Sequence, residues 1–267
     1  MSESTSSRGS LVPGFITNAV QLAGELALLS FQSLLAMLRP PFEWRTWVHQ
    51  MEQIGVRSFG VASITTIFTG MVLALQTAYS LPQLGVKYYI GTVVSKSLTR
   101  ELGPVLVALI VGGRIGAGMT AELGTMKVTE QIDALRSMAA DPVKKLVAPK
   151  LIAALVMLPA LTVIGNVLGI LGGLVIAVGQ LQVSAGFYIN DVLTSLTFDD
   201  ILSGLGKSFV FAFFITIIAC HNGLTARGGA DGVGRATTDT VVLASIMVLV
   251  SDFFLTKVFY LIAGLFS

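Results

Sequence analysis

Long stretches of the chain carry no charged residue, and their lengths indicate what they form. Residues 58–86 and 151–179 each run for 29 residues without Asp, Glu, Lys or Arg. About 20 apolar residues are enough for a helix to cross the hydrocarbon core of a bilayer. Ser80 and Pro82 interrupt the first stretch, so its helix is expected to end near residue 80. The pattern predicts two membrane spans, at about 58–80 and 148–179.

Three further apolar runs are too short to cross a membrane alone. Each is 12 residues long, or about 18 Å of helix; they are residues 102–113, 209–220 and 240–251. Each span must therefore extend through charged residues, which are Arg100, Glu101, Lys207 and Asp252. The extended spans are expected at about 92–114, 201–224 and 237–262. The chain is thus predicted to be an all-α polytopic membrane protein, with five transmembrane helices in a domain covering residues 58–267.

The N-terminal region is apolar but less clearly a span. Residues 15–38 are largely apolar around Glu25, and Trp44 and Trp47 follow among basic residues. Aromatic and basic residues together are typical of a membrane interface. We expect residues 11–57 to form membrane-associated helices, interfacial or re-entrant in the inner leaflet, and a sixth full span over 15–38 is the competing interpretation. The serine-rich residues 1–10 are expected to be disordered, and Glu25 argues against a signal peptide.

Composition supports a membrane protein. Hydrophobic residues make up 54% of the chain and charged residues 12%, with a mean hydropathy of +0.81. Soluble domains carry about twice as much charge. The net charge of +2 does not indicate a nucleic-acid-binding protein. If the N-terminus is cytoplasmic, twelve of the 17 Lys and Arg residues fall on the cytoplasmic side, so the positive-inside rule favours that orientation.

Several patterns that could indicate enzyme chemistry are incomplete. One cysteine and two histidines do not make up a metal-ligand set. Gly206-Lys207-Ser208 resembles the end of a phosphate-binding loop, but Ile201 occupies the position of the required first glycine. The glycine-rich residues 227–235 link two spans and are expected to form a flexible inner loop. We expect this chain to bind no metal and no cofactor.

The four charged residues within the spans are candidates for a functional site. A charge at the centre of a bilayer costs about 2.5–3.5 kcal/mol and normally faces a protein interior or a cavity. Glu101 and Asp252 both fall about 18 Å from the inner boundary, and Lys207 falls in the same outer half. We predict that Arg100, Glu101, Lys207 and Asp252 form one neutral cluster in a transport path. The alternative is an ion-pair network that only fixes helix packing.

The longest polar stretch, residues 114–150, separates the second and third spans. Residues 122–138 are expected to form a helix with apolar residues near one face, including Leu123, Ile132 and Leu135. Such a helix is suited to docking onto a partner. The alternative is a connector that rests on the membrane surface.

A row of glycines lies in the span at 148–179. Gly165, Gly169 and Gly173 share one helix face at four-residue spacing. Small residues in such a row let two helices approach closely. The row is therefore predicted to be a helix-packing surface.

Several motifs together resemble the MlaE permease family. Residues 100–104 read Arg-Glu-Leu-Gly-Pro, and residues 121–135 read Ala-Glu-Leu-Gly-Thr-Met-Lys-Val-Thr-Glu-Gln-Ile-Asp-Ala-Leu. Asp141-Pro142 and Pro149 continue the similarity, and residues 232–238 read Gly-Val-Gly-Arg-Ala-Thr-Thr. The resemblance runs from about residue 40 to the end, and the N-terminal helix matches only in character.

The resemblance implies the membrane subunit of an ABC transporter that moves glycerophospholipids between the bacterial inner membrane and a periplasmic carrier, in support of outer-membrane lipid asymmetry. The implied partners are a second copy of the chain, a cytoplasmic ATPase that uses ATP and Mg²⁺, a periplasmic MCE-type lipid-binding ring and a small cytoplasmic accessory subunit. The chain itself would not be an enzyme. The resemblance also implies a lipid cavity lined by Arg100, Glu101, Lys207 and Asp252, and an ATPase-coupling helix that includes Glu122, Lys127, Glu130, Asp133, Leu135, Arg136 and Met138.

Three other interpretations stay open at this point. An ion-coupled transporter or channel could use Glu101, Lys207 and Asp252 as a proton relay. An intramembrane enzyme could use Glu101 and Asp252 as an acid/base pair, although no nucleophile or metal set accompanies them. A related permease could import another hydrophobic lipid, such as a sterol or a fatty acid.

Overall fold

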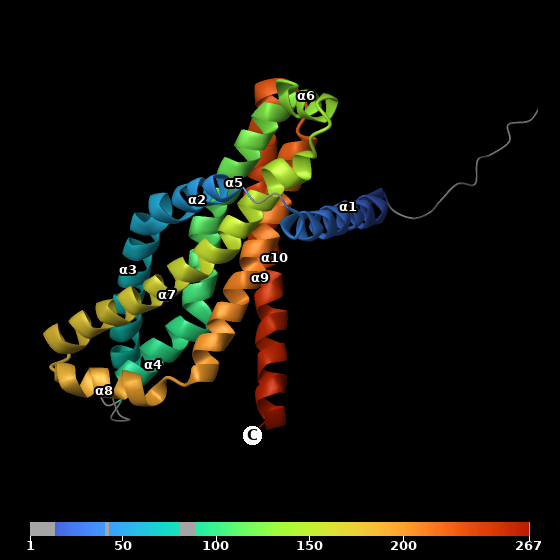
Figure 1. Ribbon diagram of the computed structural model, residues 1–267. Coiled ribbons are helices and arrows are strands. Elements are labelled where there is room, and N and C mark those ends of the chain that lie inside the picture. Colours follow the sequence, from blue (N-terminus) through green and yellow to red (C-terminus); the bar gives the residue numbers. More distant parts are fainter. Residues whose placement is uncertain (1–13, 41–42, 81–88, 267) are drawn as a thin grey trace, which may run out of the picture.

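All regular secondary structure in the part of the chain that the computed structural model describes, residues 14–40, 43–80 and 89–266, is helical (Figure 1). The helices are α1 (Gly14–Met37), α2 (Trp44–Met51), α3 (Arg57–Ser80), α4 (Ile90–Ser97), α5 (Gly103–Val128), α6 (Gln131–Ser137), α7 (Ala148–Gly179), α8 (Ala185–Ser195), α9 (Phe198–Thr225) and α10 (Gly229–Phe266). Short π-helical segments lead into α3, α5 and α7; they are Glu52–Val56, Leu98–Leu102 and Val143–Val147. The expected disorder of residues 1–10 lies outside the described residues.

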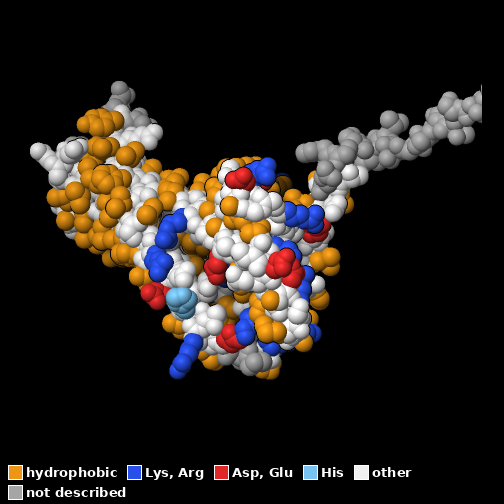
Figure 2. Space-filling model, turned by 90° about the horizontal axis from the view of Figure 1, so that it is seen from above, with side chains coloured by type: hydrophobic (Ala, Val, Ile, Leu, Met, Phe, Trp, Pro, Cys, Tyr) orange, Lys and Arg blue, Asp and Glu red, His pale blue; other side chains and the backbone are white. Residues whose placement is uncertain are grey.

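The long helices α3, α5, α7, α9 and α10 form a bundle with two distinct ends (Figure 1). Helices α2 and α6 lie toward one end, called here the α6 end, while α4, α8 and the end of α10 lie at the other, the α8 end. Helix α1 runs across the direction of α9 and α10 and contacts α7 and α9. The view onto the α6 end in Figure 2 shows charged side chains gathered there and hydrophobic side chains on the flank.

Six helices in the described part of the chain are long and apolar enough to cross a membrane. Five of them contain the expected spans, and the bounds of α7 match the expected 148–179. The sixth is the N-terminal segment Ala19–Met37, which qualifies by length and composition. The all-α fold is therefore confirmed. The count of five spans plus one interfacial helix stays a prediction, as does the division into domains.

The prediction of a single helix over residues 122–138 is wrong. Helix α5 continues past the membrane-spanning run to Val128, and α6 starts separately at Gln131. Between them Glu130 has a left-handed backbone with φ of 62°, a conformation that costs a residue with a side chain about 1–2 kcal/mol. Ile132 is fully buried, and its packing holds α6 beside the end of α5.

The prediction of a flexible loop at residues 227–235 is also wrong. Gly228 and Gly229 have φ values of 92° and 66°, and they make the turn from α9 into α10, which starts at Gly229. A Cβ at Gly232 would lie 1.7 Å from the Arg227 carbonyl oxygen. The glycines therefore form a close-packed helix start, because they allow the positive φ angles and the backbone contact that other residues do not.

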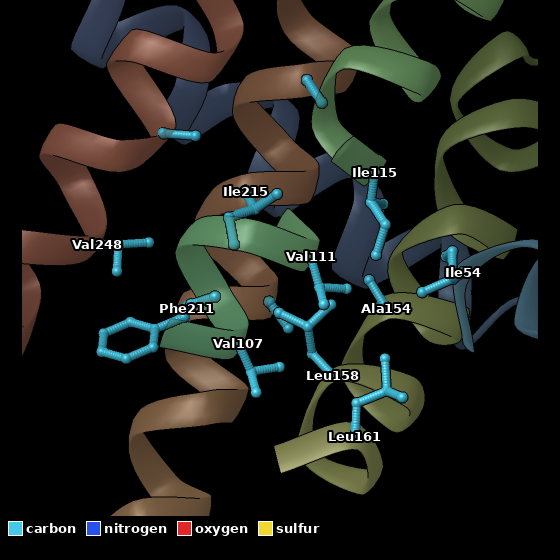
Figure 3. Close-up of a cluster of buried hydrophobic side chains, with 14 of the residues drawn as sticks. Ile54, Val107, Val111, Ile115, Ala154, Leu158, Leu161, Phe211, Ile215 and Val248 are labelled. Atoms are coloured by element: carbon cyan, nitrogen blue, oxygen red, sulfur yellow. The ribbon is translucent and has the colours of Figure 1, made fainter. Parts of the chain in front are cut away.

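The main hydrophobic cluster lies between α5, α7, α9 and α10 (Figure 3). Val107 and Val111 of α5 lie close to Leu158 of α7, and Phe211 and Ile215 extend from α9. Large apolar side chains of α3 and α10 that lie outside this cluster are exposed. Such faces are suited to lipid or to another protein rather than to water.

The glycine row of α7 lies where α7 meets α3 and α8. A Cβ at Gly169 would lie 2.9 Å from the Thr66 carbonyl oxygen of α3, and one at Gly165 would lie 3.0 Å from Thr66 Cγ2. A Cβ at Gly173 would lie 2.6 Å from Tyr188 Oη of α8. The backbones of α3 and α7 are thus in direct contact, which requires residues without side chains at these positions.

Gly169→Leu is expected to destabilise the bundle by about 1–3 kcal/mol, the typical cost of overpacking. Thermal unfolding and recovery of intact protein in detergent measure the effect. Gly179→Leu is the control, because it lies on the same helix with no atom within 4 Å of the added Cβ. If the two variants are equally stable, the glycine row is not a helix-packing surface and only reflects the usual composition of a membrane span.

Candidate functional site

Lys207 lies in the first half of α9, on the side of the bundle that carries α8, and its side chain is completely buried. Its Nζ lies 2.5 Å from Glu101 Oε2 and 3.0 Å from Asp252 Oδ1. It also donates a hydrogen bond to Thr256 Oγ1 at 2.7 Å. A buried ammonium without a partner would cost several kcal/mol. The two carboxylates, one just before α5 and one on α10, therefore allow Lys207 to occupy this position.

Glu101 lies in the π-helical segment Leu98–Leu102, immediately before α5. Such segments are rare and occur frequently at functional sites. Gly204 of α9 packs against this segment, since a Cβ there would lie 2.1 Å from the Thr99 carbonyl oxygen. Gly204 precedes Lys207 by one helical turn, so the close approach brings the Lys207 side chain to Glu101.

Arg100 does not belong to the same group. Its Nε donates a hydrogen bond to Asp200 Oδ1, and Asp200 Oδ2 accepts the Thr197 N–H at 2.9 Å in a capping box that starts α9. The prediction of one neutral cluster of four is therefore wrong. Lys207 and its two carboxylates carry a formal charge of −1, and Arg100 with Asp200 forms a separate neutral pair. Adjacent residues on a helix point in different directions, which separates Arg100 from Glu101.

Two residues of this region, Asp200 and Thr256, were not expected from the sequence. Asp200 is fully buried, and the Thr197-x-x-Asp200 spacing is the available signal, because an acidic side chain three residues after a threonine is typical of a helix start. Thr256 lies one turn after Asp252 and joins Lys207 to Glu101 through its hydroxyl. A lone threonine in an apolar helix gives no comparable signal.

The carboxylates are only partly covered. The side chain of Glu101 is 39% exposed and that of Asp252 is 21% exposed, while Lys207 is at 0%. The Asp252 Oδ1 atom is buried and has no hydrogen bond to any described residue, although Lys207 Nζ is close to it. Exposed carboxylates on apolar helices require a cavity or a second protein beside them. The group therefore presents its two carboxylates to a polar molecule that reaches it, with the buried Lys207 ammonium beside them.

Several of the residues expected on the coupling helix form ion pairs, and several are exposed. Glu122 forms an ion pair of 2.5 Å with Lys150, which is buried at the start of α7. Asp133 pairs with Lys127 at 3.0 Å and with Arg136 at 3.6 Å. These charges hold α5, α6 and α7 together. Of the expected coupling residues, Glu122, Glu130, Arg136 and Met138 are exposed, and Leu135 is half-buried.

Helix α8 fixes the start of α4 from outside the bundle. Asp191 accepts hydrogen bonds from the Thr92 backbone N–H at 2.8 Å and from Thr92 Oγ1 at 2.6 Å. Tyr188 is buried beside it and donates to the Ile170 carbonyl oxygen at 3.1 Å. Burial raises the pKa of the Tyr188 hydroxyl, so it stays a hydrogen-bond donor. The π-helical segment that carries Glu101 follows α4 and is positioned through it.

The remaining candidate ligands do not gather into a metal site. Among the described residues no group of three His, Cys, Asp or Glu side chains could hold a metal ion. His221 Nε2 lies 2.9 Å from Glu25 Oε2 and links α9 to α1, and Cys220 is buried. The contact between His221 and Glu25 explains how a glutamate is accommodated in the apolar α1.

The fold and the ion-paired group define a multi-pass helical membrane protein with a polar site inside its bundle. The family described as Permease MlaE matches residues 47–258. The chain belongs to the MlaE permease family, as its motifs predicted.

Three relatives illustrate the family. A probable ABC transporter permease protein of Rickettsia typhi is 43% identical over 240 residues, which cover 90% of this chain and 93% of the relative. The intermembrane phospholipid transport system permease protein MlaE of Haemophilus influenzae is 36% identical over 238 residues, or 89% of this chain and 91% of the relative. The chloroplastic protein TRIGALACTOSYLDIACYLGLYCEROL 1 of Arabidopsis thaliana is 35% identical over 237 residues, or 89% of this chain and 68% of the relative.

Lys207→Ala is expected to lower the free energy of unfolding by about 3–5 kcal/mol, because it leaves two carboxylates without a counter-charge. Thermal unfolding in detergent measures the loss. Lys257→Ala removes an exposed lysine from α10 and is the control, with little change expected. If the two variants unfold at the same temperature, the ion pairs do not stabilise the bundle.

Proposed function

We propose that the chain is the membrane permease subunit of an ABC transporter that moves glycerophospholipids between the inner membrane and a periplasmic lipid carrier, in support of outer-membrane lipid asymmetry. The observation that carries the proposal is the buried Lys207 between two partly exposed carboxylates within an MlaE-family bundle. The name of the Haemophilus relative, an intermembrane phospholipid transport permease, supports the same substrate class.

The charge arrangement is suited to a phospholipid head group. The phosphate would compete with Glu101 and Asp252 for Lys207, and a head-group amine would pair with the carboxylate that is released. The exposed edges of both carboxylates give such a head group a direct approach. Exchange of partners pairs Lys207 with the phosphate and the amine with a carboxylate, so the net charge of the group stays at −1 and Lys207 never becomes a lone buried ion.

A second copy of the chain would complete the cavity. Exposed aromatic and apolar side chains follow α10 beside the ion-paired group, including Phe253, Phe254 and Tyr260. Exposed apolar patches of this kind commonly mark contacts between subunits. We propose that two permeases face each other there, with their two Lys207 groups in one cavity.

The proposed orientation places the N-terminus and the α6 end in the cytoplasm, following the distribution of basic residues. Hydrolysis of ATP belongs to a separate ATPase that docks at the α6 end with its small accessory subunit. The lipid-binding ring would meet the α8 end in the periplasm. The exposed Glu130, Arg136 and Met138 are the proposed contact residues for the ATPase.

Purification of the chain from its native membrane, followed by mass spectrometry, tests the proposal. We expect an ABC ATPase, a lipid-binding ring protein and glycerophospholipid to co-purify. Reconstituted complex should then transfer phospholipid only when ATP is present. A chain that purifies without an ATPase and supports proton-driven flux in liposomes would identify an ion-coupled transporter instead. A sterol or fatty acid as the bound lipid would identify a related import permease.

Met138→Asp is expected to release the ATPase or reduce its stimulation several-fold, because it places a charge on an apolar side chain that is 70% exposed at the α6 end. Pull-down of the ATPase and its hydrolysis rate are the measurements. Ser137→Asp adds the same charge to the preceding, exposed position and is the control. Unchanged pull-down and hydrolysis for Met138→Asp would show that the ATPase binds elsewhere.

A further inference from the structure

A pocket of about 340 Å³ lies between the end of α1, the start of α2 and the segment that leads into α7. It shares no lining residue with the Lys207 group. Met37 and Ile152 form part of an apolar wall, and Trp47 lines the pocket from α2. The charged residues of its lining are Arg39, Glu43, Asp141, Lys144 and Lys145.

The two acidic residues of the pocket already have partners. Glu43 pairs with Lys145 at 3.5 Å, and Asp141 Oδ1 accepts the Val143 backbone N–H at 2.9 Å. Lys144 uses one of its three N–H groups to bind the Pro40 carbonyl oxygen at 2.7 Å, and the Arg39 guanidinium has no partner among the described residues. Arg39 and Lys144 therefore have donors available for an anion, and the lining as a whole carries one excess positive charge.

The surroundings of the pocket place it at the depth of lipid head groups. Exposed apolar side chains line α1 and α2 on both sides of it, including Phe31, Leu38, Trp44 and Val48. Helices with apolar residues beside Trp, Arg and Lys are typical of the boundary between head groups and acyl chains. An anionic lipid can therefore reach this pocket while its acyl chains stay in the membrane.

We propose that the pocket binds an anionic phospholipid such as phosphatidylglycerol, with its phosphate between Arg39 and Lys144 and the start of an acyl chain along Met37 and Ile152. Guanidinium and ammonium groups both bind phosphate oxygens through charge-assisted hydrogen bonds. The lipid would join α1 to the start of α7 and would stay in its own leaflet. This site is distinct from the proposed transport cavity and does not depend on transport.

Fluorescence of Trp47 gives a local readout, because the chain has only two tryptophans. In the full chain carrying Trp44→Phe, reconstituted in phosphatidylcholine, brominated phosphatidylglycerol should quench Trp47 more strongly than brominated phosphatidylcholine at the same mole fraction. Loss of two phosphate contacts should weaken the preference about tenfold or more. Arg39→Ala with Lys144→Ala should therefore abolish the difference between the two lipids.

Arg45→Ala with Arg57→Ala is the matched control, because it removes two exposed cations of the same region that do not line the pocket. This control should keep the preference for phosphatidylglycerol. Equal quenching by both lipids in the parent chain, or a preference that survives Arg39→Ala with Lys144→Ala, would overturn the proposal. A response of Trp47 to inorganic phosphate in detergent, as strong as its response to the lipid, would overturn it in favour of a soluble anion.

Discussion

The buried ammonium of Lys207 is the interaction on which the α8 side of the bundle depends. It joins three parts of the chain that are far apart in sequence: the π-helical segment before α5, the first half of α9 and the second half of α10. Inside an apolar bundle each of these charges must be compensated. The position of α9 against α10 is therefore set by Lys207 and Asp252, and the position of Glu101 is set by the same amine.

Close backbone contacts make this arrangement possible. Gly204 lets α9 approach the π-helical segment, and Gly169 lets α7 approach α3. Helix α8 adds a polar clamp through Asp191 at the start of α4. Packed helices thus surround a small group of side chains in which Lys207 is completely buried and Glu101, Asp252 and Thr256 are partly exposed. The partly exposed carboxylates give a polar molecule access to this group from outside the bundle.

Much of the fold could be predicted from the sequence, because uncharged runs and helix length constrain membrane spans strongly. The depth of Glu101, Lys207 and Asp252 followed from the same arithmetic, and the structure brings these three together. Arg100 was misplaced because depth along a helix says nothing about direction around it, and because the buried Asp200 was not recognised as its partner.

Local backbone geometry was the least predictable part. The break at Glu130 depends on tertiary packing of Ile132 and on the pairing of Lys127 with Asp133, and neither contact is visible in a periodic pattern. The glycine-rich residues 227–235 were predicted to form a flexible loop because they link two spans. In the structure the same glycines allow a tight turn and a helix that packs against it.

The central claim is that the charges of the Lys207 group bind the lipid head group during transport, in addition to holding the helices together. Replacement of the whole group by uncharged side chains of similar shape, Glu101→Gln, Lys207→Met and Asp252→Asn, leaves no lone buried ion and should preserve folding. ATP-dependent phospholipid transfer by the reconstituted complex, measured with assembly and ATPase activity at parental levels, is the decisive measurement. The account predicts that transfer is lost. Transfer at the parental rate would contradict it and leave the group as a structural ion-pair network.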